Sequence, residues 1–204
     1  MLFYILTILV SMVIIIFANV LAVPFELNNL LYVTLSTAAC TIGVIAVDGL
    51  GAFVVRRCLP VKWFLPSRQL FQVSKKERNF YKKIKIKSWK DKVPELGMFT
   101  AFSKSEFNPS GDKAYLERFI VESNFGVICH LQNAIFGFVI LFIPFWVGGN
   151  NFIFPCHLSI WLPVFIVNFI LSLLPVFILR YTTYTLNRLY EKKARLEMEK
   201  NNLL

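Results

Sequence analysis

The sequence predicts an all-α integral membrane protein with four transmembrane helices, a basic amphipathic helix at the membrane interface and a cytoplasmic C-terminal helical extension. Hydrophobic residues make up 56% of the 204 residues, and the mean hydropathy is +0.60. The apolar residues gather in four runs of about 20 residues, the length that crosses a bilayer as a helix. The net charge is +10, and most cations fall between two of these runs. We therefore expect a single membrane domain over residues 1–204.

The four predicted spans cover residues 2–23, 30–55, 125–147 and 158–179. A cleavable signal peptide is the alternative for the first run. However, no basic residue precedes it, and its apolar stretch exceeds a typical signal core. Asp48 lies in the second span and His130 in the third. An ionisable group in hydrocarbon is costly, so these two residues are the first candidates for a functional site.

A basic loop over residues 56–113 separates the second and third predicted spans. Its first part, Arg56 to Lys92, contains 13 of the 22 Lys and Arg residues, whereas residues 148–156 carry no charge. The positive-inside rule then places this loop and both termini in the cytoplasm of a multi-pass cell-membrane protein. Ser74 to Lys90 alternates lysines with apolar residues, which is typical of a helix lying on anionic headgroups. Membrane lipids are the expected partners, and nucleic acid is not.

A polar stripe follows the third predicted span. At 100° per residue its members fall within about 100° of one another. They are Glu122, Gly126, Cys129, His130, Asn133 and Gly137. Such a stripe faces the interior of a helix bundle, where small and polar residues also serve ordinary packing. His130 stands out because histidine exchanges a proton near neutral pH.

Asp48 and His130 are expected at similar depths in the membrane. Asp48 lies eight residues before Arg56, and His130 lies eight residues after Glu122. A carboxylate there would orient the imidazole and leave its other nitrogen as a general base. A structural polar contact, or Asp48 capping Arg56, are the alternatives.

Metal-dependent chemistry is disfavoured. Asp48-Gly-Leu-Gly begins like the DGxxAR signature of CDP-alcohol phosphotransferases, but Phe53 replaces the arginine and the later paired aspartates are absent. The four cysteines show no metal-ligand spacing. No metal and no cofactor are expected.

Residues 86–97 read IKSWKDKVPELG, which resembles the IKxWKDxLPxxG segment of the glycosyl-4,4'-diaponeurosporenoate acyltransferases. These are small bacterial membrane proteins of carotenoid biosynthesis. The resemblance runs from about Ser74 to Leu189 and includes residues 115–122, His130 and residues 179–181. It implies a membrane acyltransferase that uses acyl-CoA or a similar thioester donor and a lipid or glycolipid hydroxyl as acceptor.

The resulting hypothesis makes His130 the general base, with Asp48 or Glu122 orienting its ring. Arg180, Lys90 or Lys92 would hold phosphates of the donor or the acceptor headgroup. The remaining candidate substrate contacts are Trp89, Asn133, Asn168 and Tyr181. The alternative is a non-enzymatic lipid-binding scaffold or a transporter accessory subunit, which needs only the polar stripe and the basic loop.

Overall fold

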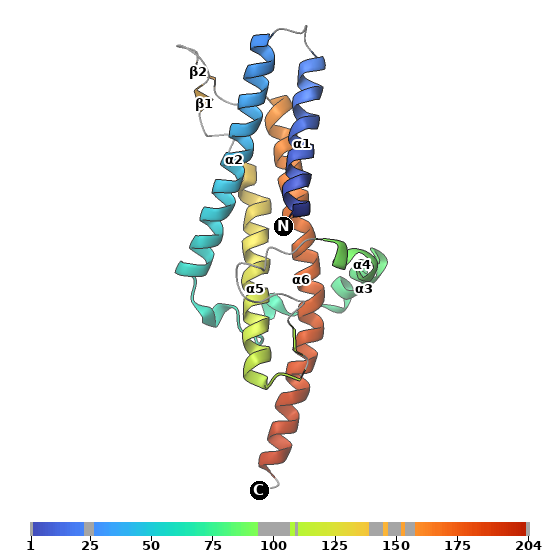
Figure 1. Ribbon diagram of the computed structural model, residues 1–204. Helices are drawn as coiled ribbons and strands as arrows, with labels where there is room; N and C mark the ends of the chain where they lie inside the picture. The colour runs from blue at the N-terminus through green and yellow to red at the C-terminus, as the bar shows by residue number, and fades with distance from the viewer. Residues whose placement is uncertain are drawn as a thin grey trace. The chain divides into compact units, whose positions relative to one another are not determined.

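The computed structural model describes residues 2–22, 27–93, 107–108, 110–138, 145–146, 152–153 and 158–202. Within these residues the chain is mainly helical, as predicted (Figure 1). The α-helices are α1 (Leu2–Leu21), α2 (Leu27–Cys58), α3 (Lys75–Lys83), α4 (Ile86–Trp89), α5 (Lys113–Phe136) and α6 (Leu158–Asn201). The 3-10 helices are η1 (Val61–Trp63), η2 (Gln69–Phe71) and η3 (Lys90–Lys92). Two short antiparallel strands complete the elements, β1 (Phe145–Trp146) and β2 (Phe152–Ile153).

Three of the described helices are long and apolar enough to cross a membrane. Their apolar segments are Tyr4–Leu21, Leu30–Cys58 and Leu158–Glu199, which correspond to the first, second and fourth predicted spans. The third predicted span, residues 125–147, is not confirmed. Helix α5 ends at Phe136, and Phe145–Trp146 form a strand. The apolar part of α5 from residue 125 rises only about 18 Å, against the roughly 30 Å of a hydrocarbon core.

Helix α6 continues far beyond the end of the predicted fourth span. It is a single helix of 44 residues, so the C-terminal extension is helical, as predicted (Figure 1). The sequence explains this continuity, because residues 158–201 contain no glycine and the last part is rich in Leu, Ala, Glu, Lys and Arg. These residue types have high helix propensity.

The chain forms two compact units. Unit 1 comprises Met1–Val54 and Leu131–Leu173, and unit 2 comprises Val55–His130 and Leu174–Leu204. Helices α2, α5 and α6 each contribute residues to both. All 22 Lys and Arg residues belong to unit 2. Whether the protein behaves as one domain, as predicted, stays a prediction.

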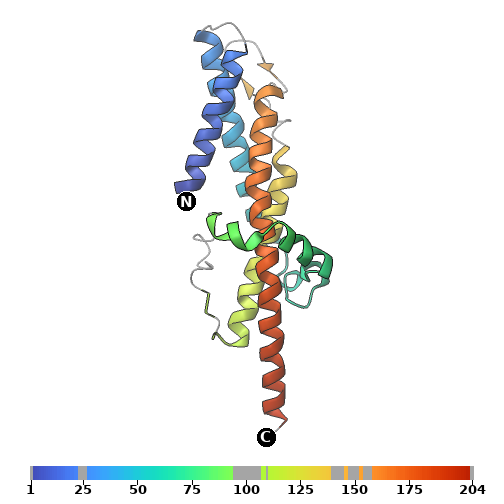
Figure 2. The ribbon, with the colours of Figure 1, turned by 90° about the vertical axis from the view of Figure 1, so that its right-hand side faces the viewer.

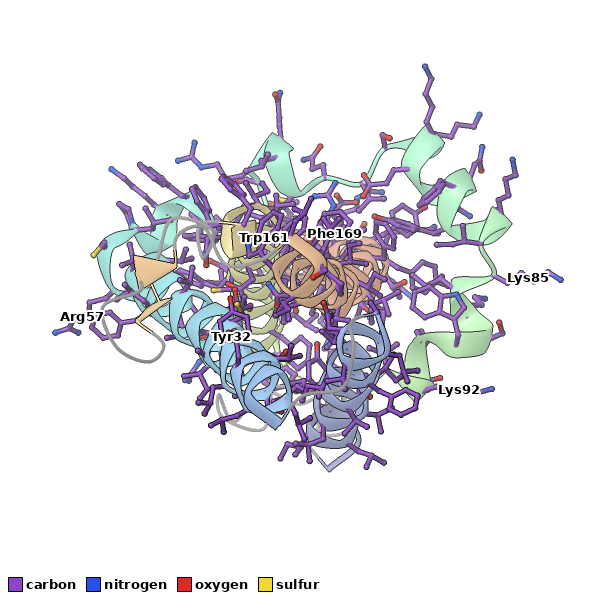
Figure 3. All side chains as sticks on the ribbon, turned by 90° about the horizontal axis from the view of Figure 1, so that it is seen from above. Tyr32, Arg57, Lys85, Lys92, Trp161 and Phe169 are labelled. Carbon is purple, nitrogen blue, oxygen red and sulfur yellow. The ribbon has the colours of Figure 1, made fainter. Side chains whose placement is uncertain are left out.

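Unit 1 has an apolar core between α1, α2 and the first part of α6. Its buried members are Ile15, Val33, Cys40, Val44, Ile160, Trp161 and Val164. Tyr32 packs against this core, and Figure 3 labels both Tyr32 and Trp161. Tyr4 ties α1 to α6, because its hydroxyl donates a hydrogen bond to the Leu171 carbonyl at 2.6 Å. Large apolar side chains such as Val13 and Ile42 are exposed, as suits a surface that meets lipid.

Unit 2 is built on the contact between α5 and the second part of α6. Gly126 permits this contact, since a Cβ there would lie 2.9 Å from Cδ1 of Leu179. The segment that contains η1 also packs on α5. The ring of Phe64 stacks on Phe125 with centroids 3.7 Å apart, and Asn124 Nδ2 donates to the Phe64 carbonyl at 2.8 Å.

The segment from Ser74 to Lys90 is not the single amphipathic helix that the sequence predicts. Ser74 caps α3 by accepting a hydrogen bond from the Glu77 N–H, but Lys85 has a left-handed backbone (φ 51°) that separates α3 from α4. Tyr81 and Ile86 are buried with Ile178 of α6. Figures 1 and 2 both show α3 and α4 beside α6. The apolar side of this segment therefore packs on protein rather than on the acyl boundary.

Candidate functional site

His130 lies on α5 as the last residue of unit 2, and it is half-buried. The described residues of unit 2 give its imidazole no hydrogen-bond or ion-pair partner. A half-buried ring without an internal partner can present a nitrogen to a ligand. This is the first requirement of a general base.

Glu122 is bound to a cation and not to His130. Its Oε2 lies 2.9 Å from Nη1 of Arg56, and the Arg56 guanidinium lies 5.7 Å from the centroid of the Phe125 ring. Glu122 and His130 are eight residues apart on one helix, which is about 12 Å along its axis. Arg56 therefore has a partner within unit 2, and the alternative of an Asp48 cap on Arg56 stays a prediction. Arg56 and Glu122 are 66 residues apart in the sequence, so their ion pair could not be predicted from the sequence.

Arg180 of α6 forms hydrogen bonds with α3 and with the segment that precedes it. Its Nε and Nη2 donate to the two carboxylate oxygens of Glu77 at 2.8 and 2.7 Å, and its Nη1 donates to the Leu70 carbonyl at 2.7 Å. Tyr81 also donates to Glu77, at 2.6 Å. Burial alone would raise the pKa of the Glu77 carboxyl, but the hydrogen bonds from Arg180 and Tyr81 outweigh it and hold this pKa below its ordinary value. Most donors of Arg180 are thus occupied, which leaves little for a phosphate.

The other predicted substrate contacts in unit 2 lie on α4, η3 and α6, and they differ in how accessible their side chains are. Trp89 and Tyr181 pack at the edge of the cluster around Tyr81. Lys90 pairs with Asp91 at 2.6 Å. Lys92 is exposed and points away from the helices in Figure 3. Of these four residues, Lys92 is the one most available to a soluble anion.

A basic groove lies along the C-terminal part of α6. It encloses about 670 Å³, and its lining includes Tyr184, Arg188, Lys192 and Arg195. Arg78 of α3 lies over the Tyr184 ring at 4.9 Å and donates to the Tyr184 hydroxyl at 2.7 Å. This groove was not predicted from the sequence. Its signal was present, because Arg188, Lys192 and Arg195 are spaced by four and three residues, which places them on one face of a helix. Glu191 and Glu199 also line it.

The polar residues predicted for the second and fourth spans come together in unit 1. Asn168 of α6 lies beside the side chain of Asp48 of α2, and its Nδ2 donates to the Asn133 carbonyl at 3.3 Å. Asp48 belongs to unit 1 and His130 to unit 2, so the contact between them stays a prediction. Within the described ranges, no three His, Cys, Asp or Glu side chains gather as metal ligands would.

Comparison with known proteins identifies one family model, described as glycosyl-4,4'-diaponeurosporenoate acyltransferase, which matches residues 60–192. The match covers roughly two thirds of the chain. It includes His130, Glu122 and Arg180, whereas Asp48 lies before it. No curated protein and no solved structure matches the chain.

Proposed function

Because the chain belongs to the glycosyl-4,4'-diaponeurosporenoate acyltransferase family, we propose that it transfers an acyl group from a thioester donor to a hydroxyl of a membrane-borne lipid or glycolipid. The family acts in carotenoid biosynthesis. The observation that supports this reaction best is His130. It lies inside the matched segment, and its imidazole has no partner within the described part of unit 2.

In the proposed reaction His130 acts on the acceptor hydroxyl. An imidazole nitrogen takes the hydroxyl proton as the oxygen attacks the thioester carbonyl carbon. The carbon–sulfur bond then breaks, and the leaving thiolate takes the proton from the imidazolium. An ester and a free thiol result, and the imidazole returns to its neutral form. General-base catalysis of this kind contributes about 10²–10⁴-fold to the rate.

We place the donor at the cytoplasmic face, where its phosphates would meet cations of unit 2. Arg180 is held by Glu77, so Lys92 and the groove lined by Arg188, Lys192 and Arg195 are better suited to bind them. All Lys and Arg residues lie in this unit, and the positive-inside rule puts cation-rich segments in the cytoplasm. Both termini are cytoplasmic in this arrangement.

The proposal is tested by comparing the intact lipids of bacterial cells with and without the protein. An enzyme of this class adds a lipid species heavier by one acyl group, which alkaline hydrolysis of the ester removes. The purified protein in liposomes should form the same species from labelled acyl-CoA and the extracted acceptor lipid. Identical lipid profiles in both strains, with no transfer in liposomes, would refute acyl transfer and leave a scaffold role.

A further inference from the structure

One short segment of unit 2 leaves a group of large apolar side chains exposed. This η1–η2 segment comprises residues 57–71, from the last turn of α2 to the end of η2. Among the described residues of unit 2, six large apolar side chains are exposed, and three of them belong to this segment. They are Val61, Trp63 and Leu70, which are 58%, 51% and 69% exposed. Single exposed apolar residues are common, but a group of them marks a contact with a membrane or another molecule.

The rest of the η1–η2 segment is firmly packed. Phe64 and Phe71 are each only 2% exposed, and their ring centroids lie 5.8 Å apart. Phe64 also stacks on Phe125 of α5. Within the segment, Nε of Arg68 donates a hydrogen bond to the Lys62 carbonyl at 3.0 Å. The segment therefore has an inner side that packs on unit 2, and the three exposed apolar side chains lie outside this packing.

Two attachments hold the η1–η2 segment where the apolar parts of the helices end. The apolar segment of α2 ends at Cys58, and η1 begins three residues later, after no more than about 10 Å of chain. Near the other end, the Leu70 carbonyl accepts a hydrogen bond from Arg180 at 2.7 Å, and Arg180 is the first charged residue of α6. Both helices pass from apolar to charged sequence beside this segment. Such a transition is expected at the level of the lipid headgroups.

The charge of the η1–η2 segment favours one kind of lipid. The sequence has no acidic residue over residues 49–76, whereas Arg57, Lys62 and Arg68 are exposed cations. Arg57 points away from the helices in Figure 3. Tryptophan is enriched at membrane–water interfaces, and cations near the surface are attracted to anionic headgroups. Apolar side chains and cations side by side, without a carboxylate, therefore match the boundary of a membrane that contains anionic phospholipid.

We propose that the η1–η2 segment binds anionic phospholipid, such as phosphatidylglycerol, at the membrane boundary. Its three exposed apolar side chains enter the edge of the acyl layer, and its three exposed cations contact headgroup phosphates. The lipid contact thus falls on a different segment from the one that the sequence predicts, because the apolar side of residues 74–90 packs on α6. The proposal does not rest on acyl transfer, and it is tested without it.

Photo-cross-linking tests the contact with lipid. The full-length protein carrying Trp63→p-benzoylphenylalanine is placed in nanodiscs of equal amounts of phosphatidylcholine and phosphatidylglycerol. Illumination should join position 63 to lipid, and phosphatidylglycerol adducts should outnumber phosphatidylcholine adducts by about tenfold. Met198→p-benzoylphenylalanine is the matched control, because Met198 is 59% exposed but lies 18 residues beyond Arg180, about 27 Å along α6. It should give at least about tenfold fewer lipid adducts.

The role of the cations is tested by adding Arg57→Gln/Lys62→Gln to the cross-linking protein. Within the described part of the chain, neither side chain forms a hydrogen bond or an ion pair, so we expect the fold to be kept. The preference for phosphatidylglycerol should fall by about tenfold. Lys192→Gln/Arg195→Gln removes the same charge from α6, 12 and 15 residues beyond Arg180, and should leave the preference unchanged.

Equal lipid labelling at positions 63 and 198 would overturn the proposed contact. Cross-links from position 63 to a second copy of the chain or to another protein, in place of lipid, would assign the segment to a protein interface and overturn it as well. A preference for phosphatidylglycerol that neither charge variant reduces, or that both reduce equally, would overturn the role of the cations. If Arg57→Gln/Lys62→Gln fails to fold, Lys62→Gln alone decides, with an expected loss of about threefold.

Discussion

Unit 2 and unit 1 differ in how their carboxylates are paired, although both contain buried amide oxygens without a partner. In unit 2, carboxylates on α3 and α5 have partners: Glu77 binds Arg180, and Glu122 binds Arg56. In unit 1, Asp48 and the amides of Gln132 and Asn133 each keep a buried oxygen without a donor. These two ion pairs therefore help to hold unit 2 together. Among the described residues, His130 of unit 2 has no polar partner and Asp48 of unit 1 keeps one oxygen unpaired, and these two remain our candidates for function.

The largest expected effect concerns the unpaired histidine. His130→Ala should reduce acyl transfer by about 10²–10⁴-fold, because the general base is lost. The amount of folded protein in the membrane should change little, since the ring gives up no internal hydrogen bond in the described part of unit 2. Radiolabelled transfer in liposomes measures this. His157→Ala is the control, because His157 is the other histidine of the sequence and lies beside the uncharged segment 148–156. Near-normal product formation by His130→Ala would remove this residue from the mechanism.

The next effect tests whether the paired charges of unit 2 are structural. Arg180→Met leaves Glu77 without its main partner and should lower the free energy of unfolding by about 3 kcal/mol. The double variant Glu77→Leu/Arg180→Met removes both charges and should recover much of that loss. Thermal unfolding in detergent checks both. A fully stable Arg180→Met protein would show that this residue is free for ligand binding, as the sequence suggested.

The same pair predicts a dependence of stability on pH. The pKa of Glu77 lies below its ordinary value of 4.5 in the folded protein. Its contribution to stability is therefore complete above about pH 4.5 and is lost as the pH falls through the folded-state pKa. The stability difference between wild type and Glu77→Gln should be constant at neutral pH and shrink below about pH 4.5. A difference that grows on acidification would contradict the pairing.

The smallest effect is expected at an exposed ion pair of unit 2. Lys113 and Glu197 lie 3.5 Å apart, with side chains 38% and 52% exposed. Glu197→Ala should change the unfolding free energy by less than about 0.5 kcal/mol, since such pairs are screened by water. A loss of unfolding free energy as large as that of Arg180→Met would contradict this prediction. It would mean that the burial of an ion pair does not determine how much the pair stabilises unit 2.

Local features of this fold could be predicted from sequence, and distant pairings could not. Ser74 caps α3, and Asp112 caps α5 by accepting from the Tyr115 N–H at 2.7 Å. Such a cap is a local feature, because it needs only residues three apart. Three of the four apolar runs are helices long enough to span a membrane. The third run is not confirmed, because α5 ends at Phe136 and most of the residues that follow it up to 147 lie outside the described ranges.

For the candidate site, the sequence supplied the residue types but not their partners. Arg180 and Glu77 are 103 residues apart, so the sequence pattern could not predict that Arg180 pairs with Glu77. Asn168 was expected to contact substrate, and the structure gives it Asp48 as a neighbour.

The most direct test of the difference between the units measures stability and acyl transfer on the same two variants, Asp48→Asn and Arg180→Met. The account predicts that Asp48→Asn keeps the wild-type unfolding temperature, or raises it, while its acyl transfer falls, because Asp48 is proposed to orient the His130 ring. Arg180→Met should lose stability while the protein that remains folded still transfers the acyl group. The opposite result would contradict the account: an unstable Asp48→Asn with normal activity per folded molecule, beside a stable and inactive Arg180→Met.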